Sequence, residues 1–192
     1  QASVGMVTMV LAFFAVFTIY LTVTTTFVTR RQDLFLKRLR SGEASDAAIL
    51  IGLAVPPVLL FVVQTAVVLA VMLAIGVAWP AHWWWVAVAI VGLVVSSVAC
   101  AVGTTAVTPD ASAAQISTMP YVIVVIATLI MAAIVENRFF DLTPGGALVT
   151  LVNEAYGATG AGSPLTAVLG LGLWTALGVE LAKRRFRWEP RT

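Results

Sequence analysis

The sequence predicts an all-α integral membrane protein, a polytopic bundle of transmembrane helices that forms one domain over residues 1–192. Of its 192 residues, 60% are hydrophobic and only 10% are charged, whereas a soluble domain carries about 25% charged residues. Five apolar stretches each approach or exceed the roughly 20 residues that cross a bilayer. The stretches are continuous, so they favour helices over the alternating segments of a β-barrel, and a helix pairs its own backbone amides in lipid.

The five predicted spans cover residues 4–27, 47–77, 84–107, 117–135 and 165–182. We interpret the first as a span of the mature protein, because it lacks the basic start and the small-residue cleavage site of a signal peptide. The second, with about 31 residues or roughly 46 Å of helix, is longer than a bilayer requires. Because it contains Pro56 and Pro57, we expect it to start in the cytoplasm, to tilt or to bend there.

The positive charges predict the orientation. Ten of the eleven Lys and Arg residues fall within 30–40 and 183–191, and only Arg138 lies elsewhere. With five spans both basic segments face the same side, which the positive-inside rule makes cytoplasmic. We therefore expect a multi-pass plasma-membrane protein with Gln1 outside and the C-terminus inside.

The outer connections are predicted to be interfacial. Residues 78–83 and the start of the next span carry four tryptophans that fit an aromatic anchor, namely Trp79, Trp83, Trp84 and Trp85. The segment 136–163 is the longest connection, and its apolar part, 147–156, predicts a short helix lying at or dipping into the outer interface. The connection 108–116 is expected to be a short inner loop.

The sequence contains few residues that could catalyse a reaction or bind a metal ion. Cys100 is the only cysteine and His82 the only histidine, so a thiolate metal site, a disulfide or a histidine-based metal site is not expected. His82 lies among tryptophans, where an interfacial position explains it. No catalytic residue and no metal ligand is assigned.

The segment from Thr29 to Asp46 is too polar for a span and too patterned for a plain loop. Phe35, Leu36 and Leu39 share one helical face, and Asp33 precedes Lys37 by four positions, a favourable ion-pair spacing. We predict a short amphipathic helix over about 30–42. From this pattern alone it lies on anionic lipid or docks a cytoplasmic partner.

This segment resembles the coupling helix of type-2 ABC transporter permeases, the group that includes actinobacterial drug- and antibiotic-export permeases. The family pattern is close to E-x-G-T-L-x-R-L-R-x-x-P, and the run from Leu36 to Arg40 fits it, with departures at Gln32, Leu34 and Glu43. Thr108-Pro109, the short outer helix and the C-terminal run from Phe186 to Arg191 are also similar. The coupling residues that the resemblance implies are Leu34, Phe35, Leu36, Lys37, Arg38, Leu39, Arg40 and Ser41.

The resemblance implies a permease that works with other subunits. The family has six spans, so one more is expected before Gln1, and a five-span subunit is the alternative. The chain has no G-x-x-x-x-G-K-[ST] loop, and its only lysines are Lys37 and Lys183. ATP and Mg²⁺ are therefore expected on a separate ABC ATPase subunit, and a second permease copy or homologue and membrane lipid as further partners. No nucleic-acid partner is expected.

Polar residues within the spans have two interpretations, a translocation path or helix packing. Thr18, Thr22, Thr25 and Thr29 recur on one predicted helical face, and threonine hydroxyls can bond back to the helix at little cost. Gln64 and Ser97 carry the same ambiguity. Gly172 and Ala176 form a small-xxx-small pair that predicts close packing of the last span.

Three classes of function remain open. The first is a permease subunit of an ATP-driven exporter of an amphipathic, drug-like or lipid-like compound. The second is a non-transporting membrane sensor or assembly subunit. An intramembrane enzyme acting on lipid is the least favoured, because it needs a constellation of reactive side chains at the membrane boundary.

Overall fold

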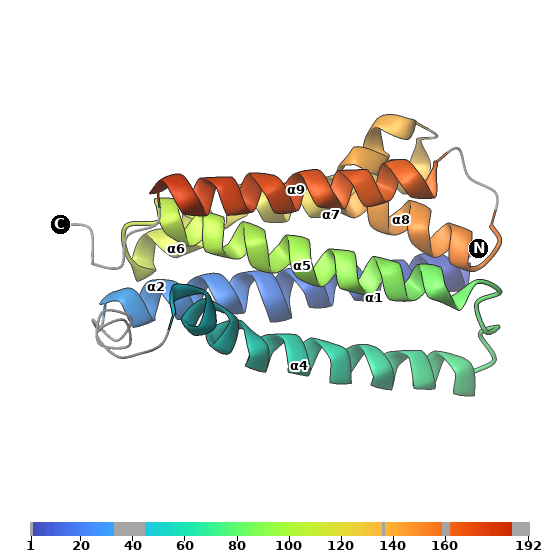
Figure 1. Cartoon of the computed structure of the whole chain (residues 1–192). Coiled ribbons are helices and arrows are strands. Elements are labelled where there is room, and N and C mark those ends of the chain that lie inside the picture. Colours follow the sequence, from blue (N-terminus) through green and yellow to red (C-terminus); the bar gives the residue numbers. More distant parts are fainter. Residues whose placement is uncertain (1, 33–44, 136, 159–161, 186–192) are drawn as a thin grey trace.

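The computed structural model describes residues 2–32, 45–135, 137–158 and 162–185. Within these ranges the chain is helical and contains no strand (Figure 1). Five helices are long and apolar enough to cross a membrane: Val4–Gln32, Ala48–Ala74, Trp83–Val107, Ala111–Ile134 and Pro164–Arg185. The prediction of a helical, multi-pass membrane protein is confirmed.

The first span is one continuous helix made of α1 (Ala2–Phe14), a π-helical segment η1 (Ala15–Leu21) and α2 (Thr22–Gln32). The hydroxyl of Thr22 donates to the carbonyl of Phe17, five residues back, at 3.1 Å. The helix continues to Gln32, past the predicted end of the span near residue 27. Arg30 and Arg31, which were expected to begin the coupling helix over 30–42, belong to α2, and Arg31 is buried against the bundle. The predicted coupling residues, 34–41, lie outside the described residues.

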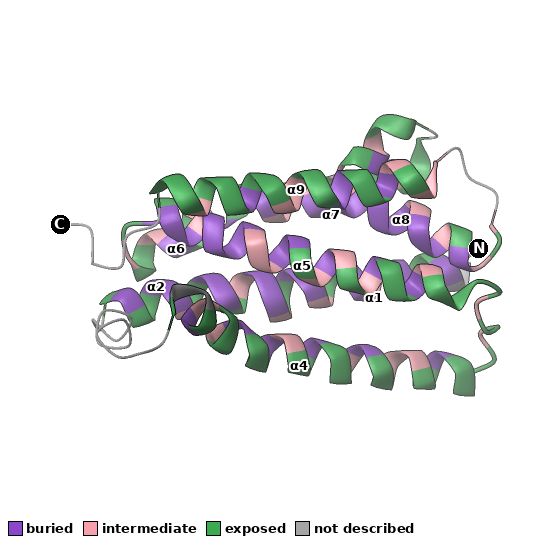
Figure 2. Cartoon of the chain, in the orientation of Figure 1, coloured by how far each residue is buried: buried purple, intermediate pink, exposed green. Residues whose placement is uncertain are grey.

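Helix α4 (Asp46–Ala74) starts at Ser45, whose hydroxyl accepts a hydrogen bond from the amide of Ala48 at 3.2 Å. It keeps both prolines within the helix, and Figure 1 shows its first turns at an angle to the rest, as expected for a proline bend. The helix ends about three residues before the predicted limit, where Gly76 adopts a positive φ of 89°. Figure 2 shows α4 exposed over most of its outward face.

The helices α5 (Trp83–Val107) and α9 (Pro164–Arg185) cross at two glycines. A Cβ on Gly178 would lie 2.5 Å from the carbonyl carbon of Ala99, and one on Gly103 would lie 2.7 Å from the carbonyl oxygen of Gly178. The predicted small pair was misplaced, because Gly172 and Ala176 are exposed and a Cβ on Gly172 meets nothing within 4 Å. The small residues of this helix that are buried are Ala167, Gly170 and Gly178.

The fourth span begins earlier than predicted. Helix α6 (Ala111–Ser117) occupies most of the expected inner loop 108–116, and α7 (Met119–Ile134) follows after a break at Thr118. Asp110 caps α6 by accepting the amide of Ala113 at 2.8 Å. Pro120 stands in the first turn of α7, where its missing N–H costs no intrahelical bond, so the chain restarts there.

The predicted short helix is present as α8 (Pro144–Ala155), preceded by the 3₁₀ turn η2 (Arg138–Leu142). It is inserted into the bundle rather than lying on its surface, since nine of its residues are buried. A Cβ on Gly145 would collide with the carbonyl of Val125, and one on Gly146 with that of Phe140. Two glycines therefore let α8 approach α7 and η2 closely.

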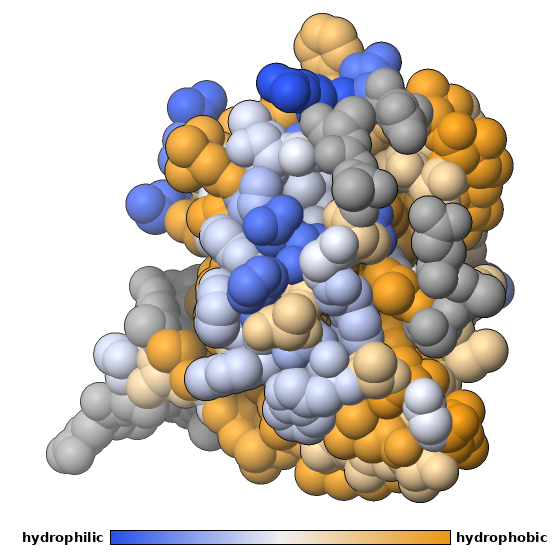
Figure 3. Space-filling model, turned by 90° about the vertical axis from the view of Figure 1, so that its right-hand side faces the viewer, coloured by the Kyte–Doolittle hydropathy of each residue, from blue (hydrophilic) through white to orange (hydrophobic). Residues whose placement is uncertain are grey.

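The bundle has two chemically different ends. We call the end with Arg30, Arg31, Lys183, Arg184 and Arg185 the basic end, and the end with Trp79, Trp83, Trp84 and Trp85 the aromatic end. Figure 3 looks onto the aromatic end, where hydrophilic residues occupy the centre and hydrophobic ones lie along the right and lower edges. Such a face suits a membrane surface, with apolar sides toward lipid and polar groups toward water.

Candidate functional site

The basic end is organised around Arg31, which is fully buried at 0% exposure. Its Nη1 donates to the carbonyl of Thr105 at 3.0 Å, and its Nη2 donates to the carbonyls of Thr108 and of Pro109, the latter at 3.1 Å. These carbonyls belong to the last turn of α5 and to the connection that follows. The last carbonyls of a helix lack intrahelical partners and carry partial negative charge, so a cation is well placed there. We call this arrangement the Arg31 clasp.

The connection held by the Arg31 clasp is also braced internally. The hydroxyl of Thr108 lies 2.7 Å from that of Ser117 and donates to the carbonyl of Thr104 at 2.8 Å. Hydrogen bonds from the Ser112 hydroxyl and the Ala113 amide hold the pKa of Asp110 below its usual value. The turn between α5 and α6 is therefore held in one conformation by its own hydrogen bonds.

A second cluster lies deeper in the bundle, on the same buried face of the first helix. Tyr20, from the π-helical segment, places its hydroxyl 2.9 Å from that of Thr104, and its ring 4.3 Å from the ring of Tyr121. Tyr121 in turn lies 3.3 Å from the Ser97 hydroxyl and meets the ring of Trp174 edge-on at 5.9 Å. The first helix, α5, α7 and α9 thus meet in one aromatic and polar cluster.

The π-helical segment explains why Tyr20 can reach this cluster. Tyr20, Phe27 and Arg31 are all fully buried and recur seven and four residues apart, so they form one face of the helix. A π turn contains more residues than an α turn. It therefore changes the direction in which the side chains of α1 point, about the helix axis, relative to those of α2. Such segments occur often at functional sites.

The polar residues predicted as path or packing are found in three surroundings. Thr18 is half-buried and donates to Oε1 of Gln64 in α4 at 2.8 Å. Thr22 and Thr25 are exposed and bond back to their own helix. Ser97 is buried beside Tyr121. Of the predicted threonine face, Thr18 thus contacts a neighbouring helix, while Thr22 and Thr25 are exposed and bond only to their own helix.

His82 and the carboxylates form no metal centre in the described parts of the chain, where no group of three or more metal-ligating side chains comes together. The amide of His82 donates to the carbonyl of Ala155 at 2.9 Å, and its ring lies 4.8 Å from that of Trp84. His82 thus fixes the start of α5 to the end of α8. Burial of the Tyr156 ring beside this junction raises its pKa.

Sequence reasoning missed the role of Asp141, a carboxylate that is only 3% exposed. One of its oxygens accepts the Thr150 hydroxyl at 2.6 Å, and the other accepts the Ser163 amide at 2.9 Å and the Thr166 hydroxyl at 2.8 Å. It thereby joins η2, α8 and the start of α9. The only sequence signal was the set of hydroxyl residues in this otherwise apolar region.

Comparison with protein-family models, with curated proteins and with solved structures finds no match to this chain. Function is therefore argued from the arrangement itself.

Proposed function

We propose that this chain is the transmembrane permease subunit of an ATP-driven ABC exporter that moves an amphipathic, drug-like or lipid-like compound out of the cell. The observation that carries the proposal is the Arg31 clasp, which stands two residues before the segment 33–44. That segment holds the coupling-helix-like run from Leu36 to Arg40. A helix that takes up movement from a partner needs a firm connection to the spans, and the clasp supplies one.

The proposed coupling route runs through both ends of the segment. On one side, α2 enters it directly after Arg31, so a displacement there reaches α5 and α6 through the carbonyls of Thr105 and Thr108. On the other side, Ser45 opens α4, which bends at its two prolines. The connection at Arg31 would be rigid, whereas α4 could bend at its prolines. A displacement of the segment by the ATPase would therefore change the angle between α4 and the rest of the bundle.

The basic end supports placing this segment in the cytoplasm. Lys183, Arg184 and Arg185 end α9 at the same end as Arg31, as the positive-inside rule requires of two cytoplasmic segments. In this proposal the plasma membrane surrounds the bundle, with the N-terminus of this segment outside and the C-terminus inside. ATP and Mg²⁺ would be bound by the partner ATPase, and the chain itself would catalyse no reaction.

Copurification tests the proposal. The full-length permease is expressed with the ATPase encoded beside it, as the natural protein, as Leu39→Asp and as the matched control Leu39→Met. We expect the ATPase to copurify with the first and third forms and to be lost from Leu39→Asp. If the ATPase never associates, or if Leu39→Asp binds it as well as Leu39→Met does, the docking claim fails.

A non-transporting sensor or assembly subunit is the second candidate, favoured by the cluster of cations at the basic end, which suits anionic lipid or an acidic partner. It differs from the first in one outcome. A sensor would keep its partner without supporting ATP-dependent efflux from cells that carry the pair.

A further inference from the structure

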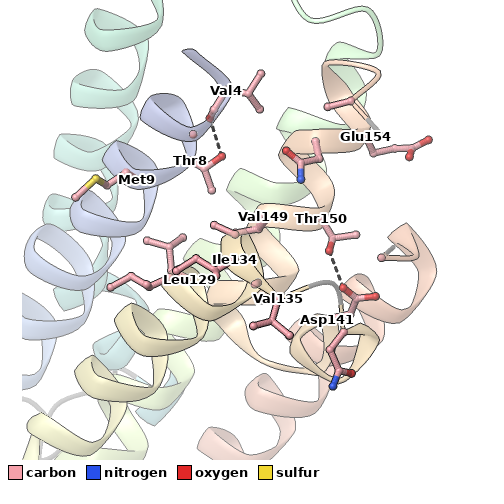
Figure 4. Close-up of a pocket in the computed structure, with 18 of the residues that line it drawn as sticks. Val4, Thr8, Met9, Leu129, Ile134, Val135, Asp141, Val149, Thr150 and Glu154 are labelled. Carbon is pink, nitrogen blue, oxygen red and sulfur yellow. Dashed lines mark hydrogen bonds between the residues drawn. The ribbon is translucent and has the colours of Figure 1, made fainter. Parts of the chain in front are cut away.

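The aromatic end contains a cavity of about 680 Å³ between α1, α7, α8 and η2 (Figure 4). Its volume lies within the range of small-molecule sites, about 300–1,000 Å³. Neither the proposed coupling route nor the Tyr20 cluster uses it. The cavity therefore needs an explanation of its own.

One side of the cavity is apolar. It is formed by residues of α1 and α7 that include Met9, Phe13, Leu129 and Ile130. Figure 4 shows Val4 and Met9 across the cavity from α8 and η2. Two of the lining residues, Met9 and Ile134, are 53% and 73% exposed. The cavity is thus open toward the lipid side of the bundle, and an alkyl chain could enter from the bilayer.

The other side is polar and acidic. It is formed by Asn137, Asp141, Thr150, Asn153 and Glu154, and no lysine, arginine or histidine is among the described residues that line the cavity. Two carboxylates without a cation in the lining favour a positively charged guest.

Asp141 and Glu154 contribute to this side in different ways. An ionised carboxylate offers about four lone-pair sites, and the three hydrogen bonds to Asp141 use one site on Oδ1 and two on Oδ2. The remaining site on Oδ1 lies beside Gly162, where a Cβ would be only 2.8 Å from that oxygen, so Asp141 contributes charge to this side rather than an open contact. Glu154 is exposed at the rim, where it can pair with a cation at little desolvation cost.

We propose that this cavity binds an amphipathic molecule whose head carries a protonated amine, with the head on the polar side next to Glu154 and the tail against α1 and α7. Two sources share this chemistry: a free long-chain amine, and a membrane lipid with an aminoethyl head. The site stands apart from the proposed ATPase coupling, because it needs neither ATP nor a partner subunit.

Binding to the full chain alone tests the proposal. The purified protein in nanodiscs of phosphatidylcholine is titrated with dodecylamine carrying a photoactivatable diazirine, and with the matching uncharged alcohol. Nanodiscs that also contain phosphatidylethanolamine form a second arm. We expect saturable labelling by the amine within α1, α7 or α8, and little by the alcohol. Weaker labelling in the second arm would identify the lipid as the natural source, and unchanged labelling the free amine.

Three variants make the test specific to the cavity. Gly5 lines it and a Cβ there meets nothing within 4 Å, so Gly5→Leu should obstruct the apolar side of the cavity without strain and reduce saturable labelling. Gly172→Leu on α9 is the matched control, because a Cβ there is equally unobstructed, and it should label normally. Glu154→Gln should weaken binding by about two- to fivefold, the effect of losing one exposed ion pair.

The proposal is overturned if the alcohol labels as well as the amine, if Gly5→Leu labels like Gly172→Leu, or if no saturable labelling occurs in either nanodisc. None of these outcomes touches the ATPase partnership. Copurification of the ATPase would still succeed or fail independently.

Discussion

Arg31 and Thr105 are 74 positions apart, yet the guanidinium of the first donates to the main-chain carbonyl of the second at 3.0 Å. The contact joins the end of the first span to the end of the third. Removing a buried arginine that donates to carbonyls destabilises the fold, because the carbonyls are then left buried without hydrogen-bond donors. It therefore fixes how these two helices end relative to one another.

Replacing Arg31 should destabilise the basic end. We expect Arg31→Met to lower the free energy of unfolding by about 2–4 kcal/mol, since three carbonyls lose charged donors. Arg31→Lys should recover only part of this, because one ammonium cannot reproduce the fork of a guanidinium. Unfolding in mixed micelles by added SDS measures both. Lys183→Met, which removes an exposed cation at the same end of the bundle, is the control, and equal effects at the two positions would contradict the clasp.

The crossing of α5 and α9 should not tolerate a methyl group. Gly178→Ala would place a Cβ 2.5 Å from the Ala99 backbone, so we expect a loss of about 1–3 kcal/mol and a lower melting temperature. Gly172→Ala, on the same helix with nothing within 4 Å of its Cβ, should instead stabilise by about 0.5–1 kcal/mol. Both variants replace glycine with alanine in the same helix. A similar change in stability in both would therefore disprove the close approach of α5 and α9 at Gly178.

Thr18 and Gln64 should be energetically coupled. The Thr18 hydroxyl donates to Gln64 at 2.8 Å between the first helix and α4. Thr18→Val and Gln64→Leu should each destabilise, while the double variant costs less than their sum, with a coupling of about 0.6–1.7 kcal/mol as measured for hydrogen bonds within membranes. The double-mutant cycle is read by unfolding in micelles. Strict additivity would show that the two side chains do not bond in the membrane and would favour a role in the translocation path.

Asp110 should give the turn between α5 and α6 an acid-sensitive cap. Because hydrogen bonds to its carboxylate lower the pKa in the folded state, the cap is fully present above the unfolded pKa of about 3.9 and is lost as the pH falls through the folded value. The melting temperatures of the natural protein and Asp110→Ala should therefore differ at pH 7 and converge below about pH 4. A difference that stays constant across this range would show that ionisation of Asp110 does not support the turn.

The spans were predictable because their signal is local. A run of apolar residues long enough to cross lipid specifies a helix whatever surrounds it, so all five predicted stretches became helices with ends shifted by a few residues. The largest shift was at residues 108–116, where the cap at Asp110 and the restart at Pro120 extended the helix into an expected loop.

The contacts between the spans were not predictable, because they depend on how helices rotate and cross. The sequence placed Arg31 in a basic cytoplasmic segment, and only the structure shows that it is buried and donates to the carbonyls at the end of α5. Gly172 and Gly178 cannot be told apart by residue type. Only the position at which α5 crosses α9 shows that the close contact is at Gly178. The π-helical segment also left no mark in the composition, although it decides which way Thr18 and Tyr20 face.

The most direct test of the central claim is ATP-dependent transport by the reconstituted pair. Inside-out vesicles containing the full-length permease and its neighbouring ATPase are supplied with ATP, and uptake of fluorescent amphipathic compounds is followed for the natural permease, Leu39→Asp and Leu39→Met. We expect uptake that requires ATP, persists in Leu39→Met and is lost in Leu39→Asp. A stable complex that hydrolyses ATP but moves no compound, or uptake unaffected by Leu39→Asp, would contradict that claim.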